Sequence, residues 1–93
     1  MNLRELQEKV KDSPVMALNP HKNVCEIMLA ATEELGEVAQ EVALLEKIGT
    51  KANWEKQGSK ERLGQEITNV LNCIVGLANH YELDLEALYK ESE

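Results

Sequence analysis

The sequence predicts an all-α protein, a small helical bundle of two long antiparallel helices plus two short helices, which oligomerises through its helical core. Two observations predict this class. Phe is absent and aromatic residues make up 3% of the 93 residues, so aliphatic side chains must fill the core, which suits packed helices better than a β-sandwich. Apolar residues also recur at alternating spacings of three and four over two long stretches, the period of amphipathic helices. The length allows one domain, residues 1–93.

The first element is a short helix over residues 2–12. Leu3, Leu6 and Val10 lie at helical spacing within it. Pro14 disfavours helical backbone in the residue before it, so the helix ends at residue 12. A loop that includes Pro20 follows.

The second element is a long helix over about residues 22–47. Its apolar positions form an unbroken a/d seam over three heptads: Val24, Met28, Ala31, Leu35, Val38, Val42 and Leu45. The Gly49-Thr50 pair ends this helix, and residues 48–58 read as an exposed loop.

The third element is a second long helix, which begins after Ser59. Its seam is formed by Leu63, Ile67, Val70, Leu71, Ile74, Ala78 and Tyr81. A break over residues 81–84 precedes a final short helix that turns Leu85 and Leu88 inward. The short connection makes the two long helices antiparallel, and their seams exceed what one small chain can cover, which favours a dimer or a higher oligomer.

Charge and cysteine usage restrict the classes of partner and compartment. The formal net charge is −7 and the pI is near 4.8, which argues against nucleic acid or an anionic membrane as a partner. Cys25 and Cys73 are isolated thiols, as expected in a reducing compartment. The charged N-terminus does not read as a signal peptide, and no apolar run reaches the length of a membrane span. We therefore expect a soluble, cytoplasmic protein.

Two similar acidic motifs give the strongest indication of function. The first is ELGEV at residues 34–38, and the second is EITNV at residues 66–70. In each motif a second oxygen ligand follows the first glutamate by three residues, Glu37 after Glu34 and Asn69 after Glu66. At about 100° per residue, both pairs lie at the same offset from their seams. If the seams face each other, four oxygen ligands can converge, which is how a hard divalent cation such as Mg²⁺ is held.

The alternative interpretation is that these acids form an ordinary solvated helix face. A single E-x-x-E motif is weak evidence for a site, because charged helix faces are common. The matched second copy on the partner helix, at the same angular offset, strengthens the case for a cation site. Without a cation between them, the carboxylates would repel one another across the interface.

These motifs, together with the closing segment GLANHYELDLEAL, resemble the MazG-like all-α nucleoside triphosphate pyrophosphatase superfamily. Its signature is E-x-x-E on one helix and E-x-x-D on the next, and the resemblance covers about residues 20–89. It implies a homodimer or homotetramer that hydrolyses a nucleoside or deoxynucleoside triphosphate to the monophosphate and pyrophosphate, as a nucleotide-pool house-cleaning enzyme. It implies Mg²⁺ as cofactor, with Mn²⁺ as the alternative. By position, the metal-binding set would be Glu34, Glu37, Glu66 and Asn69.

Further residues are assigned roles toward such a substrate. Glu37 or Glu41 is the candidate for the catalytic group that positions the attacking water. The candidate substrate-binding residues are Lys22, Asn23, Trp54 and Lys60; each also has an ordinary interpretation, as a helix cap, a core-covering Trp or a surface cation. His21 and His80 lack partners at zinc-ligand spacing, and no Gly-rich phosphate loop is present.

Asn69 departs from the superfamily signature, which has Asp at that position. An amide oxygen can ligate Mg²⁺ but brings no charge. Two other classes of protein therefore stay open. A catalytically weakened or inactive homologue would act as a nucleotide- or protein-binding module. A purely structural helical oligomer would leave the acidic residues without a cation.

Overall fold

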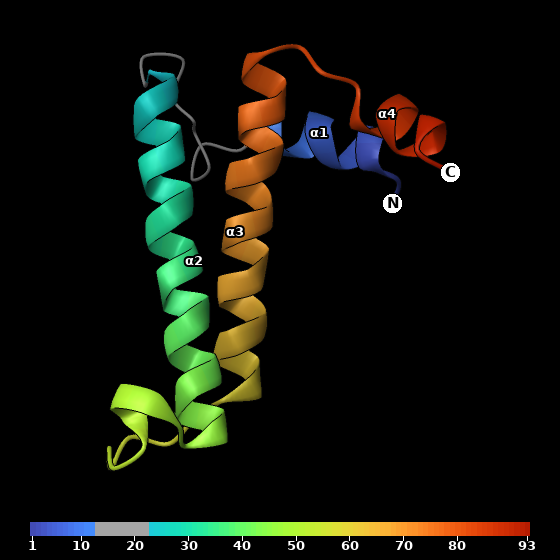
Figure 1. The fold of residues 1–93 in the computed structure, drawn as a ribbon. Coiled ribbons are helices and arrows are strands. Elements are labelled where there is room, and N and C mark those ends of the chain that lie inside the picture. Colours follow the sequence, from blue (N-terminus) through green and yellow to red (C-terminus); the bar gives the residue numbers. More distant parts are fainter. Residues whose placement is uncertain (13–22) are drawn as a thin grey trace.

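A computed structural model describes residues 1–12 and 23–93 (Figure 1). Over these residues the chain is all-helical, with two long helices packed together, so the predicted fold class is confirmed at that level. The predicted loop at residues 13–21 and Lys22 lie outside the described residues. The elements are α1 (Leu3–Asp12), α2 (Val24–Glu46), the short 3₁₀ turn η1 (Gly49–Lys51), α3 (Lys60–His80) and α4 (Leu85–Glu91).

The three α-helices α2, α3 and α4 each begin at a side chain that caps the N-terminus. The side chains of Asn23, Ser59 and Asp84 accept hydrogen bonds from the backbone N–H groups three residues on, which would otherwise lack partners. The predicted start of the third helix after Ser59 is therefore confirmed. At the other end of α2, Lys47 adopts a left-handed conformation with φ of 56°, which stops the helix two residues before Gly49.

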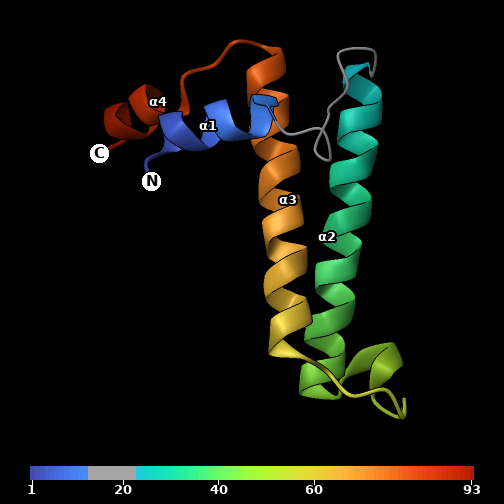
Figure 2. The ribbon, with the colours of Figure 1, turned by 180° about the vertical axis from the view of Figure 1, so that it is seen from behind.

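The two long helices form an antiparallel hairpin, and the two short helices project from it. Figures 1 and 2 show α2 and α3 side by side along their length, with α1 and α4 extending sideways from the C-terminal end of α3. None of these described helices is long and apolar enough to cross a membrane. The acidic motifs thus lie on the two helices that pack most extensively.

A buried amide joins α1 to the far end of the chain. The Nε2 of Gln7 donates to Asn79 Oδ1 at 2.8 Å and to the carbonyl oxygen of Leu83 at 2.7 Å. The side-chain Oε1 of Gln7 accepts from the backbone N–H of Leu85 at 2.9 Å. The Nδ2 of Asn79 donates in turn to the backbone carbonyl oxygen of Gln7 at 3.0 Å. Because its amide makes bonds from both ends, Gln7 can be buried without leaving a polar group unpaired.

The single chain covers only part of the predicted α2 seam. Met28, Leu35 and Val42 are exposed, whereas Ile27, which lies outside the predicted seam, is buried. The apolar stripe of α2 is wider than the surface that one partner helix can cover. α3 therefore covers one side of the stripe, and the other side faces outward.

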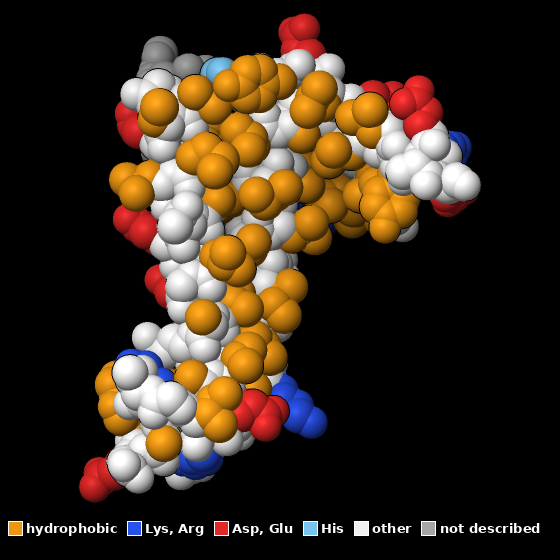
Figure 3. Space-filling model, in the orientation of Figure 1, with side chains coloured by type: hydrophobic (Ala, Val, Ile, Leu, Met, Phe, Trp, Pro, Cys, Tyr) orange, Lys and Arg blue, Asp and Glu red, His pale blue; other side chains and the backbone are white. Residues whose placement is uncertain are grey.

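The exposed part of this stripe continues onto α3 as an apolar groove. We define the apolar groove by its lining residues, which enclose about 360 Å³: Leu35, Val38, Ile67, Val70, Leu71 and Ile74. Leu35 is 58% exposed and Ile67 is 50% exposed. Figure 3 shows hydrophobic side chains gathered along the α2–α3 hairpin and in the corner where α1 and α4 leave it.

The dimensions of the chain agree with an uncovered core. The radius of gyration is 15.5 Å, whereas a compact domain of this length has a radius of about 12 Å. The accessible surface is 6740 Å², whereas a monomer of this mass has roughly 5400 Å². The single chain therefore leaves exposed an amount of surface that a compact monomer would bury.

The backbone at Gly58 lies close against Leu45 of α2. A Cβ atom at this position would lie 2.5 Å from the backbone nitrogen of Leu45 and 2.6 Å from its Cα. We expect Gly58→Ala to lower the free energy of unfolding by about 1–3 kcal/mol, because backbone atoms must move to accept the methyl group. Chemical denaturation would measure this loss.

Gly36→Ala is the matched control for Gly58→Ala. No atom lies within 4 Å of a Cβ at Gly36, which is inside α2. Alanine there should leave stability unchanged or raise it by up to about 1 kcal/mol through its better helix propensity. Equal stability of the two variants would contradict the close contact at Gly58.

Candidate metal centre

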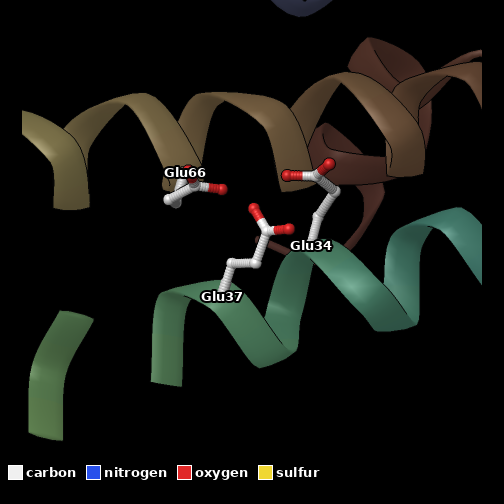
Figure 4. A group of neighbouring side chains, drawn as sticks. All are labelled: Glu34, Glu37 and Glu66. Carbon is white, nitrogen blue, oxygen red and sulfur yellow. The ribbon is translucent and has the colours of Figure 1, made fainter. Parts of the chain in front are cut away.

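Three carboxylates from the two long helices meet near the middle of the hairpin. Glu34 and Glu37 come from α2 and Glu66 comes from α3. One ligand oxygen from each lies within 4.8 Å of the other two. Figure 4 shows the three side chains pointing toward one another across the space between the helices. The structure therefore brings together three of the four residues that the two motifs nominate as metal ligands.

Helix geometry explains this convergence. Glu34 and Glu37 are three residues apart and so lie on one side of α2, about one turn from each other. The antiparallel packing of α3 brings Glu66 level with this pair. Asn69 follows Glu66 by three residues and lies about 60° round from it on α3. Asn69 is half-buried, and its amide makes no hydrogen bond with another described residue.

Two carboxylate oxygens in the cluster are buried without partners. Glu34 Oε2 and Glu66 Oε2 have almost no contact with solvent and accept no hydrogen bond from any described residue. A buried anionic oxygen is costly unless a cation or a hydrogen-bond donor offsets it. Oxygen ligands of one octahedral Mg²⁺ lie roughly 3–4.2 Å apart, so small side-chain rotations would fit this set to an ion. The donor set has the chemistry that a hard divalent cation requires.

The same crowding changes the protonation of Glu66. Its contact with the Glu37 carboxyl, partial burial and then its contact with Glu34 raise the pKa of Glu66 from 4.5 to about 7. Without a cation, the cluster therefore relieves its repulsion by holding a proton. Because cations and protons satisfy the same oxygens, they compete for this site.

This pKa predicts how the stability of the metal-free protein depends on pH. The folded state holds the Glu66 proton more tightly than the unfolded state, so this contribution to stability is complete below about pH 4.5 and is lost as the pH rises through about 7. In the presence of a metal chelator, the melting temperature of the wild type should fall between about pH 4.5 and pH 7 relative to that of Glu66→Gln.

Mg²⁺ should raise the melting temperature of the wild type more at pH 8 than at pH 5, because the ligand is then deprotonated. The titration of Asp84 does not contribute to the change in stability between pH 5 and pH 8. The hydrogen bond from Arg4 lowers the pKa of Asp84 below its usual 3.8, so its contribution changes at more acidic pH. Parallel pH profiles for the wild type and Glu66→Gln would contradict the raised pKa.

An ion pair next to the cluster involves Glu41, one of the two candidates for positioning water. Glu41 is 4% exposed, and both of its oxygens accept from Arg62 Nε at 3.2 Å. From the sequence, Arg62 precedes the second motif and could either reach phosphates or be an ordinary surface cation. The sequence spacing could have predicted the ion pair. Glu41 follows Glu37 by four residues, and Arg62 precedes Glu66 by four residues. In an antiparallel hairpin these positions come level.

Three of the predicted substrate-binding residues, Asn23, Trp54 and Lys60, are described by the structure and lie apart from the three carboxylates. Asn23 caps α2, about 16 Å along the helix axis from Glu34. Its side chain also donates to Glu26 Oε1 at 3.2 Å. Lys60 is the first residue of α3, about 9 Å along the axis from Glu66. Trp54 lies in the loop, where Lys51 Nζ is 3.4 Å from its ring centroid. Their roles toward a substrate stay predictions.

Comparison of the chain with protein-family models, with curated proteins and with solved structures found no match. Functional inference therefore depends on the residues of this chain and their arrangement. The converging carboxylates, the two unpartnered oxygens and the Glu41–Arg62 pair are the features that a function has to explain.

Proposed function

We propose that this chain is a Mg²⁺-dependent nucleoside triphosphate pyrophosphohydrolase that acts on ribo- or deoxynucleoside triphosphates in nucleotide-pool house-cleaning. The observation that carries the proposal is the convergence of Glu34, Glu37 and Glu66, with two buried oxygens that lack partners. The spacing E-x-x-E and E-x-x-N, which resembles the MazG-like signature, supports the same chemistry. Mn²⁺ is expected to substitute for Mg²⁺ because it accepts the same oxygen ligands.

The proposed reaction is hydrolysis at the α-phosphorus. A water oxygen bonds to the α-phosphorus, the bond from that phosphorus to the α–β bridging oxygen breaks, and pyrophosphate leaves with the electron pair. Glu34, Glu37, Glu66 and Asn69 would hold the metal, which would neutralise phosphate charge and lower the pKa of the attacking water. Glu37 is the most exposed of the three carboxylates, so it is placed to orient this water and accept its proton.

The direct test is pyrophosphate release from a panel of ribo- and deoxynucleoside triphosphates, with and without Mg²⁺. The proposal expects metal-dependent release from at least one triphosphate, with the monophosphate as the second product, and loss of release in Glu37→Gln. Release of inorganic phosphate instead of pyrophosphate would contradict cleavage at the α-phosphorus. The substrate that reacts fastest would identify the base and the sugar.

Asn69 favours a second candidate function, a binding module without turnover. An amide brings no charge to the metal, so a site with three carboxylates holds the cation and the substrate polyphosphate less firmly than a site with four. If a folded wild type releases no pyrophosphate but is stabilised by Mg²⁺ with a triphosphate, the binding module is the better interpretation. Gain of pyrophosphate release in Asn69→Asp would then identify Asn69 as the cause of inactivity.

We further propose that the protein is a homodimer or homotetramer in which a second copy covers the apolar groove. The groove is lined by aliphatic side chains, and the chain exposes roughly 1300 Å² more surface than a compact monomer of its mass. A standard stable interface buries about 800 Å² per partner, so this excess is large enough for a stable dimer. The carboxylate cluster lies on the same two helices, so oligomerisation would support the site by fixing their packing.

A further inference from the structure

Arg62, near the start of α3, is held in one orientation by hydrogen bonds to two residues. Its Nε donates to both oxygens of the buried Glu41 at 3.2 Å, and its Nη2 donates to the carbonyl oxygen of Gln57 at 2.5 Å. These contacts come from α2 and from the loop that leads into α3. A guanidinium fixed from two directions loses little further conformational entropy when it binds a ligand.

The guanidinium keeps donors available while it is held. Arginine has five N–H donors, and the described residues engage two of them, at Nε and Nη2. The Arg62 side chain is 43% exposed, whereas that of Glu41 is 6% exposed. The pair therefore has a buried anionic end and an accessible cationic end. A pair that served stability alone would not require accessible donors.

The accessible end lies along the same border of the hairpin as the carboxylate cluster. Arg62 precedes Glu66 by one helical turn, about 6 Å along the axis and about 40° round it. Asn69 lies on the same side of α3, about 20° from Arg62. Arg62 and Asn69 thus flank Glu66 on one face of α3, with the cation toward the loop.

We propose that Arg62 binds phosphate oxygens of the substrate and that Glu41 is the positioning residue that orients its guanidinium. This inference rests on the proposed function, since it assigns a contact for the polyphosphate of the same substrate. A nucleoside triphosphate carries more negative charge than one divalent ion neutralises, and the planar guanidinium matches phosphate geometry. This assignment of Glu41 also leaves Glu37 as the group that positions water, because both oxygens of Glu41 already accept from Arg62.

The test requires a variant that lacks the guanidinium but still folds. Removing Arg62 alone would leave Glu41 buried and unpaired, which is strongly destabilising. Replacing both residues, Arg62→Met with Glu41→Met, removes the buried charge together with its partner, and such replacements are often neutral or stabilising. The matched control is Arg4→Met with Asp84→Asn, which removes a second ion pair at 2.9 Å, has the same net change in charge and keeps an N-cap side chain on α4.

The double Met variant should keep the melting temperature and the Mg²⁺-induced increase in melting temperature of the wild type. Its KM for the Mg²⁺ triphosphate should rise roughly 10- to 100-fold, as expected for loss of a charge-assisted contact, with a smaller change in kcat. Its affinity for Mg²⁺ pyrophosphate, measured by calorimetry, should fall by a similar factor. Arg62→Lys should recover part of the loss because it keeps the charge, and the Arg4/Asp84 control should behave as the wild type.

Unchanged KM and pyrophosphate affinity in a folded double Met variant would overturn the role of Arg62 and leave the proposed function intact. Loss of the Mg²⁺ response in that variant would also overturn it, because the pair would then support the carboxylate cluster instead. A wild type that neither hydrolyses triphosphates nor binds Mg²⁺ pyrophosphate would refute the proposed function itself, and the inference with it.

Discussion

Replacing Glu37 by Gln is expected to lower Mg²⁺-dependent pyrophosphate release by roughly 10²- to 10⁴-fold, the range for loss of a positioned general base. The exchange keeps the size of the side chain but removes the charge that attracts the cation and the basic oxygen that accepts a proton. Glu37 is exposed and lies against Glu66, so its loss should not disrupt the core. Steady-state kinetics at saturating Mg²⁺ would measure the change.

Glu33→Gln is the matched control for this variant. Glu33 lies on the same helix four residues before Glu37 and is exposed, but it is not part of the carboxylate cluster. Helicity should be unchanged in both variants, and the release rate should fall in Glu37→Gln alone. Equal rates in Glu37→Gln and the wild type would show that the catalytic group lies elsewhere.

Replacing Leu71 by Glu is expected to convert the proposed oligomer to a monomer and to lower its melting temperature. Leu71 lines the apolar groove and is exposed in the single chain. Covering a Leu side chain is worth about 1.5–3 kcal/mol, and in a symmetric dimer each copy contributes one such residue, so the loss is incurred twice. Sedimentation equilibrium at several concentrations would give the mass, which for the monomer is 10.5 kDa.

Leu29→Glu distinguishes the groove from exposed leucines in general. Leu29 lies on α2 and, like Leu71 on α3, is exposed, but it does not line the groove. A surface substitution of this kind usually changes stability by less than about 0.5 kcal/mol, so mass and melting temperature should match those of the wild type. If Leu71→Glu also left both quantities unchanged, a second copy of the chain would not cover the groove.

Local signals in the sequence predicted the helices well, because helix ends depend on neighbouring residues. Ser59 indicated the start of α3, and the Gly49-Thr50 pair indicated the end of α2 to within a few residues. The exposure of Met28, Leu35 and Val42 could not be predicted in the same way. A wide apolar stripe shows that a helix packs against something, but it does not show which side the partner in the same chain covers.

Long-range contacts were beyond the reach of sequence periodicity. The amide network of Gln7 joins residues 72–78 positions apart, and no local pattern indicates it. The convergence of Glu34, Glu37 and Glu66 was predicted because two matched motifs lie on adjacent antiparallel helices. The Glu41–Arg62 pair follows from the same geometry, but each residue taken alone reads as part of a charged surface.

The Glu41–Arg62 pair and the close contact at Gly58 together fix the register of the hairpin. A slide of α3 by one turn, about 5.4 Å, would bring Arg62 level with Glu37 and put a cation among the acids. That shifted alignment would relieve the repulsion without a metal, and it would remove the site. It would also leave Glu41 buried opposite the loop and separate Gly58 from Leu45. The observed register thus keeps Arg62 paired with Glu41 and leaves the three carboxylates facing one another, with no cationic side chain of the described residues between them.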